Sequence, residues 1–144
     1  MNAHPELTRN QALVLGALAR AEGPLSAYTI LDRLRGDGFR APLQVYRALD
    51  KLTESGLVHR LESLNAFVAC ARTHDDGHDH HEHGLVAFAI CDACGKVDEF
   101  SDEEVAGRLQ GWARGKGFRA RKTTVELRGE CRDCAAKPTA PGSP

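Results

Sequence analysis

Four cysteines in two pairs carry the clearest chemistry in the sequence. Cys91 and Cys94 form one C-x-x-C, within AICDACGKVDEF, and Cys131 and Cys134 form a second, within ECRDC. Such a turn holds two thiolates about 3.5–4 Å apart, which suits two corners of a tetrahedron around zinc with Zn–S bonds of about 2.3 Å. Two such turns close a site with no open position, so the spacing predicts a structural rather than a catalytic zinc ion. Unrelated thiol turns or two disulfides are the alternative.

A second pair of metal-binding residue types lies in a predicted hairpin. Two short β-type runs flank residues 63–66 (SLNA), where Asn65 tolerates the positive φ of a tight turn. A loop centred between Leu64 and Asn65 would place His59 directly opposite Cys70, with Cβ atoms about 5 Å apart. This arrangement predicts half of a zinc site, and the alternative is a surface histidine opposite a small buried thiol.

A carboxylate and a histidine-rich loop can complete that half-site. Residues 72–84 (RTHDDGHDHHEHG) supply the histidines, and Glu99 alternates with Val97 along a short strand, so that it can point toward the boundary of two domains. We expect His59, Cys70, Glu99 and one loop histidine to form a hinge site. Thiolate, imidazole and carboxylate together favour Zn²⁺ over Fe²⁺ or Mn²⁺. A weak metal collector without fixed geometry is the alternative for the loop.

Length and charge limit the other possibilities. The chain has 144 residues and a net charge of −1, so any DNA contact must come from a local arrangement of arginines and not from an overall field. The sequence shows no secretory signal and no apolar run near transmembrane length, so we expect a soluble, cytoplasmic protein. In a reducing compartment, spaced cysteines favour metal ligands over disulfides.

Residues 1–71 are typical of a winged-helix domain. Thr8 and Ser26 can cap two helices, and Pro42 stands at the first position of a third, which ends before Gly56. Three compact helices followed by a hairpin outline the winged form, whereas a generic three-helix bundle would not need the hairpin. The expected apolar stripe of the first helix is Ala12, Leu15, Leu18 and Ala19.

Residues 85–136 predict a small α/β domain. The apolar run 84–90 is typical of a buried strand, 95–100 and 119–128 resemble further strands, and Ser101 opens a capping box before a helix. So small a layer leaves a sheet edge and a helix stripe to cover, which favours a symmetric dimer. Residues 72–84 then form a hinge loop, and 137–144 a disordered tail. The stripe of the helix is Val105, Leu109, Trp112 and Ala113.

The sequence resembles the ferric uptake regulator (Fur) superfamily, and most of all its zinc uptake regulator (Zur) branch, over residues 8–134. The motifs that carry the resemblance are LSAYTILDRLR, VYRALDKLTESGLVHRLES, NAFVAC and CDACGKVDEF with the later C-x-x-C. The resemblance implies an α+β fold with an N-terminal winged-helix DNA-binding domain and a C-terminal dimerisation domain. It also implies a zinc-responsive dimeric repressor that binds a palindromic operator, with one structural and one regulatory zinc ion per chain.

The resemblance also assigns residues. It places structural zinc on Cys91, Cys94, Cys131 and Cys134, and regulatory zinc on His59, Cys70, Glu99 and a loop histidine. The Zur pattern has that histidine seven residues before the first zinc-turn cysteine, where this chain has Gly84. The expected ligand is therefore His83, with His81 as the alternative. The resemblance places operator contacts on Tyr28, Tyr46 and Arg47. Helical spacing puts Gln44 and Lys51 on the same outward face of the third helix as Arg47, so we expect them to contact the operator as well.

Two other functions fit parts of the sequence. An iron, manganese or peroxide sensor could use the same fold, although Cys70 argues against it because all-nitrogen and oxygen ligand sets are commoner for those metals. A zinc-dependent deaminase would use His80-His81-Glu82 as H-x-E with the first C-x-x-C. The short spacing to Cys91 leaves no room for the required helix–strand crossover, so we do not expect an enzyme.

Overall fold

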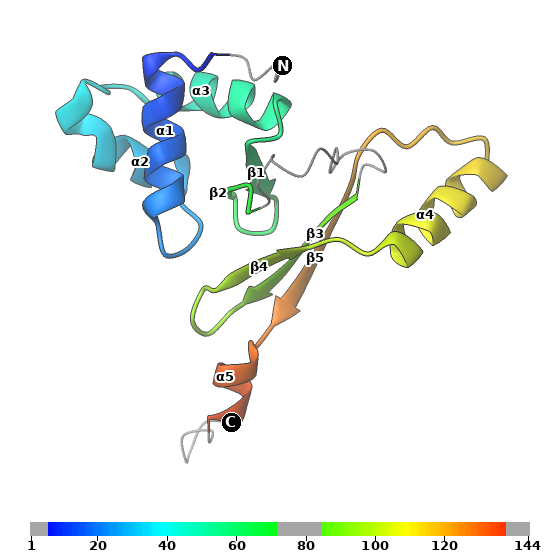
Figure 1. Cartoon of the computed structure of the whole chain (residues 1–144). Helices are drawn as coiled ribbons and strands as arrows, with labels where there is room; N and C mark the ends of the chain where they lie inside the picture. The colour runs from blue at the N-terminus through cyan, green and yellow to red at the C-terminus, as the bar shows by residue number, and fades with distance from the viewer. Residues whose placement is uncertain (1–5, 72–84, 138–144) are drawn as a thin grey trace. The chain divides into compact units, whose positions relative to one another are not determined.

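The computed structural model describes residues 6–71 and 85–137 (Figure 1). The chain divides into two compact units, Met1–Cys70 and Ala71–Pro144. Each unit has its own helices and its own sheet. Among the described residues, no helix is both long and apolar enough to cross a membrane.

The first unit contains three helices and a hairpin, as predicted. Thr8 caps α1 through a capping box with Gln11, and the Ser26 hydroxyl accepts the Thr29 N–H at the start of α2. Pro42 occupies the first turn of α3, and the left-handed Gly56 (φ 80°) follows its end. The elements are α1 (Arg9–Arg20), α2 (Ala27–Leu34), the 3₁₀ helix η1 (Arg35–Asp37), α3 (Pro42–Glu54), β1 (Val58–Leu61) and β2 (Ala66–Ala69).

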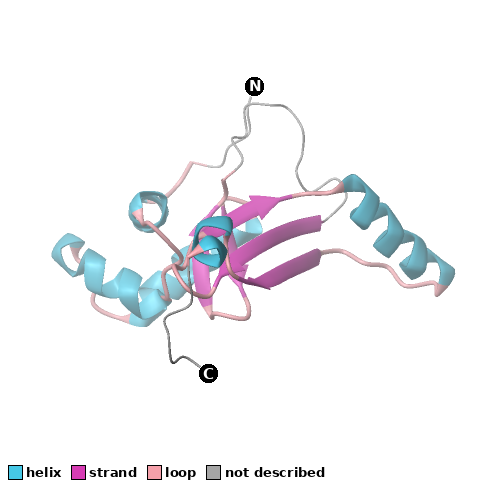
Figure 2. Ribbon diagram, turned by 90° about the horizontal axis from the view of Figure 1, so that it is seen from below, coloured by secondary structure: helices cyan, strands magenta, loops and turns pink. Residues whose placement is uncertain are grey.

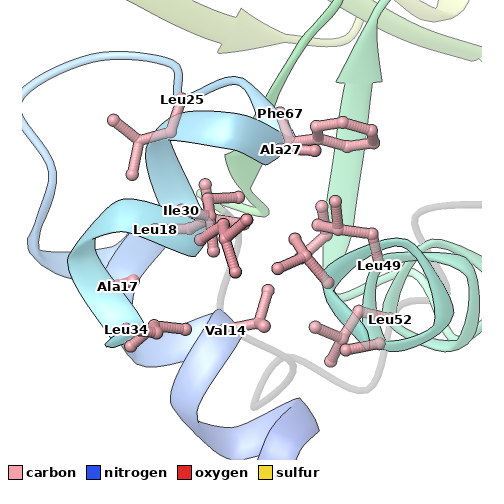
Figure 3. Packing of buried hydrophobic residues seen from close by; sticks show 14 of the residues in the cluster. Val14, Ala17, Leu18, Leu25, Ala27, Ile30, Leu34, Leu49, Leu52 and Phe67 are labelled. Atoms are coloured by element: carbon pink, nitrogen blue, oxygen red, sulfur yellow. The ribbon is translucent and has the colours of Figure 1, made fainter. Parts of the chain in front are cut away.

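The core of this unit shows that the predicted buried face of α1 was wrong in part. Leu18 is buried, but it packs with Val14 and Ala17, whereas Ala12 and Ala19 are exposed and Leu15 is half-buried. The helix is apolar on nearly every side, so spacing alone could not select the face that α2 and α3 cover. Figure 3 shows this packing, in which residues of all three helices and Phe67 of the hairpin meet.

The hairpin has a different register from the predicted one. β1 and β2 are antiparallel with His59 opposite Val68 and Leu61 opposite Ala66, so the loop is 62–65. Asn65 does adopt a positive φ of 50°, but at the end of the loop and not at its centre. Two successive turns close the loop, and this moves the pairing by two positions along β2. Leu25 adds an isolated antiparallel bridge to Phe67, which the sequence did not indicate.

The second unit is a three-stranded mixed sheet with a helical crossover. β3 lies in the centre, antiparallel to β4 and parallel to β5, and α4 connects β4 to β5. The helix begins after Asp102, whose carboxylate accepts the N–H groups of Glu104 and Val105, so Asp102 and not Ser101 is the cap. The elements are β3 (Leu85–Cys91), β4 (Val97–Phe100), α4 (Glu103–Gly115), β5 (Thr123–Gly129) and α5 (Arg132–Ala136).

The apolar stripe of α4 is not buried within the chain. Ala113 and Ala106 are buried, but Val105 and Leu109 are exposed, and Trp112 is 63% exposed. In both Figure 1 and Figure 2, α4 extends away from the edge of the sheet instead of covering a face. The predicted stripe therefore exists, but the large side chains on it remain open to a partner.

Candidate metal centres and nucleic-acid interface

The four predicted cysteines come together at one end of the second unit. Their sulfur atoms all lie within 4.8 Å of one another, and the Sγ atoms of Cys94 and Cys131 are 3.7 Å apart. A tetrahedron with Zn–S bonds of about 2.3 Å has S···S edges of about 3.8 Å. All five cysteines of the chain are free thiols, and a disulfide would need about 2.05 Å. The cluster therefore fits a closed four-thiolate zinc site, and the disulfide alternative is not supported.

The sheet explains why two distant turns meet. Cys91 is the last residue of β3 and pairs with Gly129 at the end of the parallel strand β5, so both C-x-x-C turns leave the same edge of the sheet. The first turn is closed by the Gly95 N–H bound to the Cys91 carbonyl at 3.0 Å, with Gly95 at φ 80°. Cys131 is the N-cap of α5, which carries Cys134 in its first turn.

The surroundings shift the pKa values of two thiols in the cluster in opposite directions. Backbone amides of Cys131 and Cys94 lower the pKa of the Cys91 thiol to about 6, against the opposite effect of its burial. Side-chain hydrogen bonds to Cys131 and Cys91 raise the pKa of Cys134 to about 12. The surroundings therefore favour the ionised form of Cys91 and the protonated form of Cys134. Four thiolates at this spacing would repel one another without a dication, so zinc binding would be coupled to the release of thiol protons.

An ion pair that the sequence analysis missed supports the first zinc turn. Arg128 of β5 donates from Nη2 and Nε to Asp92 Oδ1 at 2.6 and 3.0 Å. The Asp92 N–H also donates to the Gly129 carbonyl at 2.7 Å. Asp92 directly follows the expected ligand Cys91, so these bonds connect the turn to the strand that leads to the second cysteine pair.

Replacing Asp92 with alanine is expected to increase the rate at which a chelator removes the structural zinc about three- to fivefold. The ion pair is partly exposed, and pairs of this kind contribute up to about 1 kcal/mol. Zinc release can be followed with a colorimetric chelator. Asp98→Ala is the matched control, because it removes a carboxylate whose ion pair with Lys96 is 4.0 Å long and involves no cysteine. Equal release rates in both variants would exclude a role for the Asp92–Arg128 pair.

The hairpin brings His59 and Cys70 together by a different geometry from the predicted one. His59 faces Val68, so the expectation that it lies directly opposite Cys70 is wrong. Cys70 continues the ladder through its N–H, which donates to the Leu57 carbonyl at 2.8 Å. The two side chains are diagonal neighbours on the same face, and their ligand atoms lie within 4.8 Å. His59 is only 7% exposed, so a buried imidazole stands beside a half-buried thiol.

Glu99 lies on β4 in the second unit. It is half-buried together with Val97, whereas Asp98 and Phe100 are exposed, which confirms the predicted alternation. Its carboxylate Oε1 accepts the N–H of Ala71 at 3.0 Å. Ala71 directly follows Cys70, so the amide that binds this carboxylate belongs to the next residue after the thiol in the chain. The expected fourth ligand, His83 or its alternative His81, lies outside the described residues.

The first unit presents the predicted DNA-contacting residues on its surface. Tyr28 of α2 is 63% exposed, and Tyr46 and Arg47 are exposed on α3. Within the described part of the chain, Arg47 makes no hydrogen bond or ion pair, so its guanidinium donors are available. Lys51 contacts Glu54 at 3.6 Å. Residues of α1 and α3 line a shared groove, namely Thr8, Asn10, Gln11, Gln44, Arg47, Ala48, Asp50 and Lys51.

Comparison with known proteins gives a consistent result. Residues 6–128 match the ferric uptake regulator family. The zinc uptake regulation protein of Escherichia coli (strain K12) is 38% identical over 129 residues, which cover 89% of this chain and 72% of that protein. The zinc uptake regulation protein of Mycobacterium tuberculosis (strain H37Rv) is 33% identical over 128 residues, covering 88% and 92%.

Solved structures show the same fold. A zinc uptake regulator complexed with zinc and DNA matches with a TM-score of 0.80 and 37% identity, covering 90% of this chain and 83% of that one. The crystal structure of holo XcZur matches with a TM-score of 0.79 and 42% identity, covering 92% and 88%. These similarities confirm the predicted α+β architecture. The chain therefore belongs to the ferric uptake regulator family, on its zinc uptake regulator branch.

Proposed function

We propose that this protein is a zinc-responsive transcriptional repressor that binds a palindromic operator as a homodimer in the cytoplasm. The observation that carries the proposal is the similarity, over nine tenths of the chain, to a zinc uptake regulator complexed with zinc and DNA. Arg47 on α3 is exposed and has no hydrogen-bond or ion-pair partner among residues 6–71 and 85–137, which supports a DNA-reading role for that helix. The deaminase alternative is not favoured, because the relatives are named as regulators.

We infer two zinc ions per chain. The structural ion would be held by Cys91, Cys94, Cys131 and Cys134, whose sulfur atoms already fit a tetrahedron. The regulatory ion would be held by His59 and Cys70 of the hairpin, Glu99 of β4 and a loop histidine, His83 or His81. The neighbouring His59 and Cys70 side chains support this assignment, because imidazole and thiolate at this spacing are zinc ligands.

The proposed switch depends on the fact that these ligands belong to two units. His59 and Cys70 lie in Met1–Cys70, whereas Glu99 lies in Ala71–Pro144. When bound, zinc supplies bonds to both units at once. The hairpin and β4 are then held in one arrangement, in which the two α3 helices of a dimer meet successive major-groove faces. A preference of about 3–5 kcal/mol for that arrangement gives a useful switch.

The proposed dimer explains the exposed stripe of α4. Replacing Trp112 with arginine is expected to weaken dimerisation about 1,000-fold, because two copies of an aromatic contact worth about 2 kcal/mol each are lost. Sedimentation equilibrium measures this directly. Gly107→Arg is the matched control: it adds the same charge to the opposite side of α4, where an added Cβ has no described neighbour within 4 Å. A Trp112 variant that dimerises like the control would place the dimer contact elsewhere.

Selection from a random duplex library tests the function as a whole. The full chain should enrich a palindrome at micromolar or lower free zinc, and a chelator should remove this selectivity. Enrichment that requires Fe²⁺ or Mn²⁺ and does not occur with zinc would instead support the iron or manganese sensor. Failure to enrich any sequence with any of these metals would contradict a role as a DNA-binding regulator.

A further inference from the structure

The side chain of Gln44 is oriented by the start of its own helix. Its Oε1 accepts two backbone N–H groups, from Arg40 at 2.7 Å and from Ala41 at 3.1 Å. Ala41 is the N-cap residue of α3 and has no side chain that could cap the helix, so Gln44 supplies the cap instead. The atom that faces these two donors must be the carbonyl oxygen, because the amide nitrogen carries only donors.

This cap restricts what Gln44 can offer to DNA. Both lone pairs of the carbonyl oxygen are used, so only the two N–H groups of Nε2 remain. Among the described residues, none accepts a hydrogen bond from them. A glutamine normally recognises adenine with both ends of its amide, accepting from N6 and donating to N7. Gln44 cannot do so without giving up the cap of α3.

Gln44 also lies beside two of the predicted DNA-contacting residues. It lines the groove shared by α1 and α3 together with Arg47 and Lys51. A donor-only group matches guanine best, because O6 and N7 are adjacent acceptors in the major groove, whereas the N6 amino group of adenine would oppose it. Building on the proposed function, we propose that Gln44 is a specificity-determining residue that donates to the O6 and N7 edge of a guanine.

Two variants separate this role from capping. Gln44→Glu keeps an oxygen for the Arg40 and Ala41 amides and adds a negative charge that suits a helix N-terminus, but it has no donor. Gln44→Met removes both the cap and the donor. Each zinc-loaded full chain is taken through selection from a random duplex library, and its thermal unfolding is measured alongside.

We expect Gln44→Glu to unfold at the same or a higher temperature than the unaltered chain, and Gln44→Met at a lower one. Both variants should lose base preference at one G·C pair of each half-site and keep the rest of the consensus. 7-Deazaguanine at that position should weaken the unaltered chain about tenfold and leave both variants unaffected. General repulsion between the introduced carboxylate and the phosphates would lower all affinities equally, so it cannot produce this positional loss.

The inference is overturned if the unaltered chain and both variants select the same consensus at every position. It is also overturned if the lost preference is for an A·T pair, because adenine would then be read through both ends of the amide. If the unaltered chain selects no zinc-dependent sequence, the proposed function itself fails. That outcome is distinct from a zinc-dependent consensus that Gln44 does not influence.

Discussion

Replacing Cys70 with serine is expected to lower zinc-dependent operator affinity by about 100-fold or more while the fold and the structural zinc remain. Serine is nearly isosteric, but its hydroxyl does not ionise near neutral pH and is a poor zinc ligand. Changes in residues that only support a metal ligand already cost about 10–100-fold in metal affinity, so loss of a ligand should cost at least that much. Operator titrations at buffered free zinc, with zinc content measured per chain, give both quantities.

Ala71→Ser is the matched control for the Cys70 variant. It introduces the same hydroxyl one residue further along, at an exposed position, and keeps the backbone N–H that binds Glu99. The control should respond to zinc as the unaltered chain does. A Cys70→Ser variant with an unchanged zinc response would show that the regulatory zinc is bound elsewhere.

Replacing Cys94 with serine is expected to remove the structural zinc and the cooperative unfolding of the second unit. Structural zinc in small domains contributes on the order of 10–16 kcal/mol of binding free energy, which is coupled to folding. This unit has a small core centred on β3, and α4 adds mainly Ala106 and Ala113 to the buried apolar residues. The other interactions of this unit therefore cannot compensate for the loss of zinc. Circular dichroism during heating and zinc content per chain measure the effect.

Ala93→Ser provides the comparison for the Cys94 variant. It adds a hydroxyl to the same exposed turn and leaves all four thiols, so its zinc content and unfolding should be unchanged. The single tryptophan of the chain, Trp112, reports on the second unit by its fluorescence. If Cys94→Ser kept its zinc and its unfolding temperature, the four cysteines would not be a zinc site.

Local signals in the sequence predicted much of the fold. Thr8, Ser26 and Pro42 each act on a backbone group within their own turn, so they mark helix starts without information from the rest of the chain. The two cysteine pairs were also predictable, since C-x-x-C spacing already defines half of a tetrahedron. These features depend on few residues, and the structure confirms them.

Other features depend on tertiary contacts, which a single sequence does not contain. The register of the hairpin depends on the loop, and a shift of its centre by one residue moved His59 from Cys70 to Val68. The buried face of α1 depends on the helices that cover it. Pairing of Asp92 with Arg128 requires the parallel register of β3 and β5, so no local pattern indicated it.

The two metal centres also differ in how far they could be predicted. The proposed structural site lies within one unit, on one edge of one sheet, and its four expected ligands are described residues. The proposed ligands of the regulatory zinc come from both units and from the loop 72–84. His59 and Cys70 are still neighbours because the observed register differs from the predicted one by two positions along β2. A shift by an even number of residues keeps both side chains on the same face of the hairpin. Assignment of Glu99 and a loop histidine to the same ion remains a prediction.

Simultaneous measurement of zinc content and operator affinity across a series of buffered free zinc concentrations tests the gating most directly. We predict that the first zinc ion per chain binds without conferring DNA binding, and that operator affinity rises as the second ion is taken up. In the Cys70→Ser chain, the second ion and the rise should both be absent. Full operator affinity with only one zinc ion per chain, in the unaltered chain or in the Cys70→Ser chain, would contradict the proposed switch.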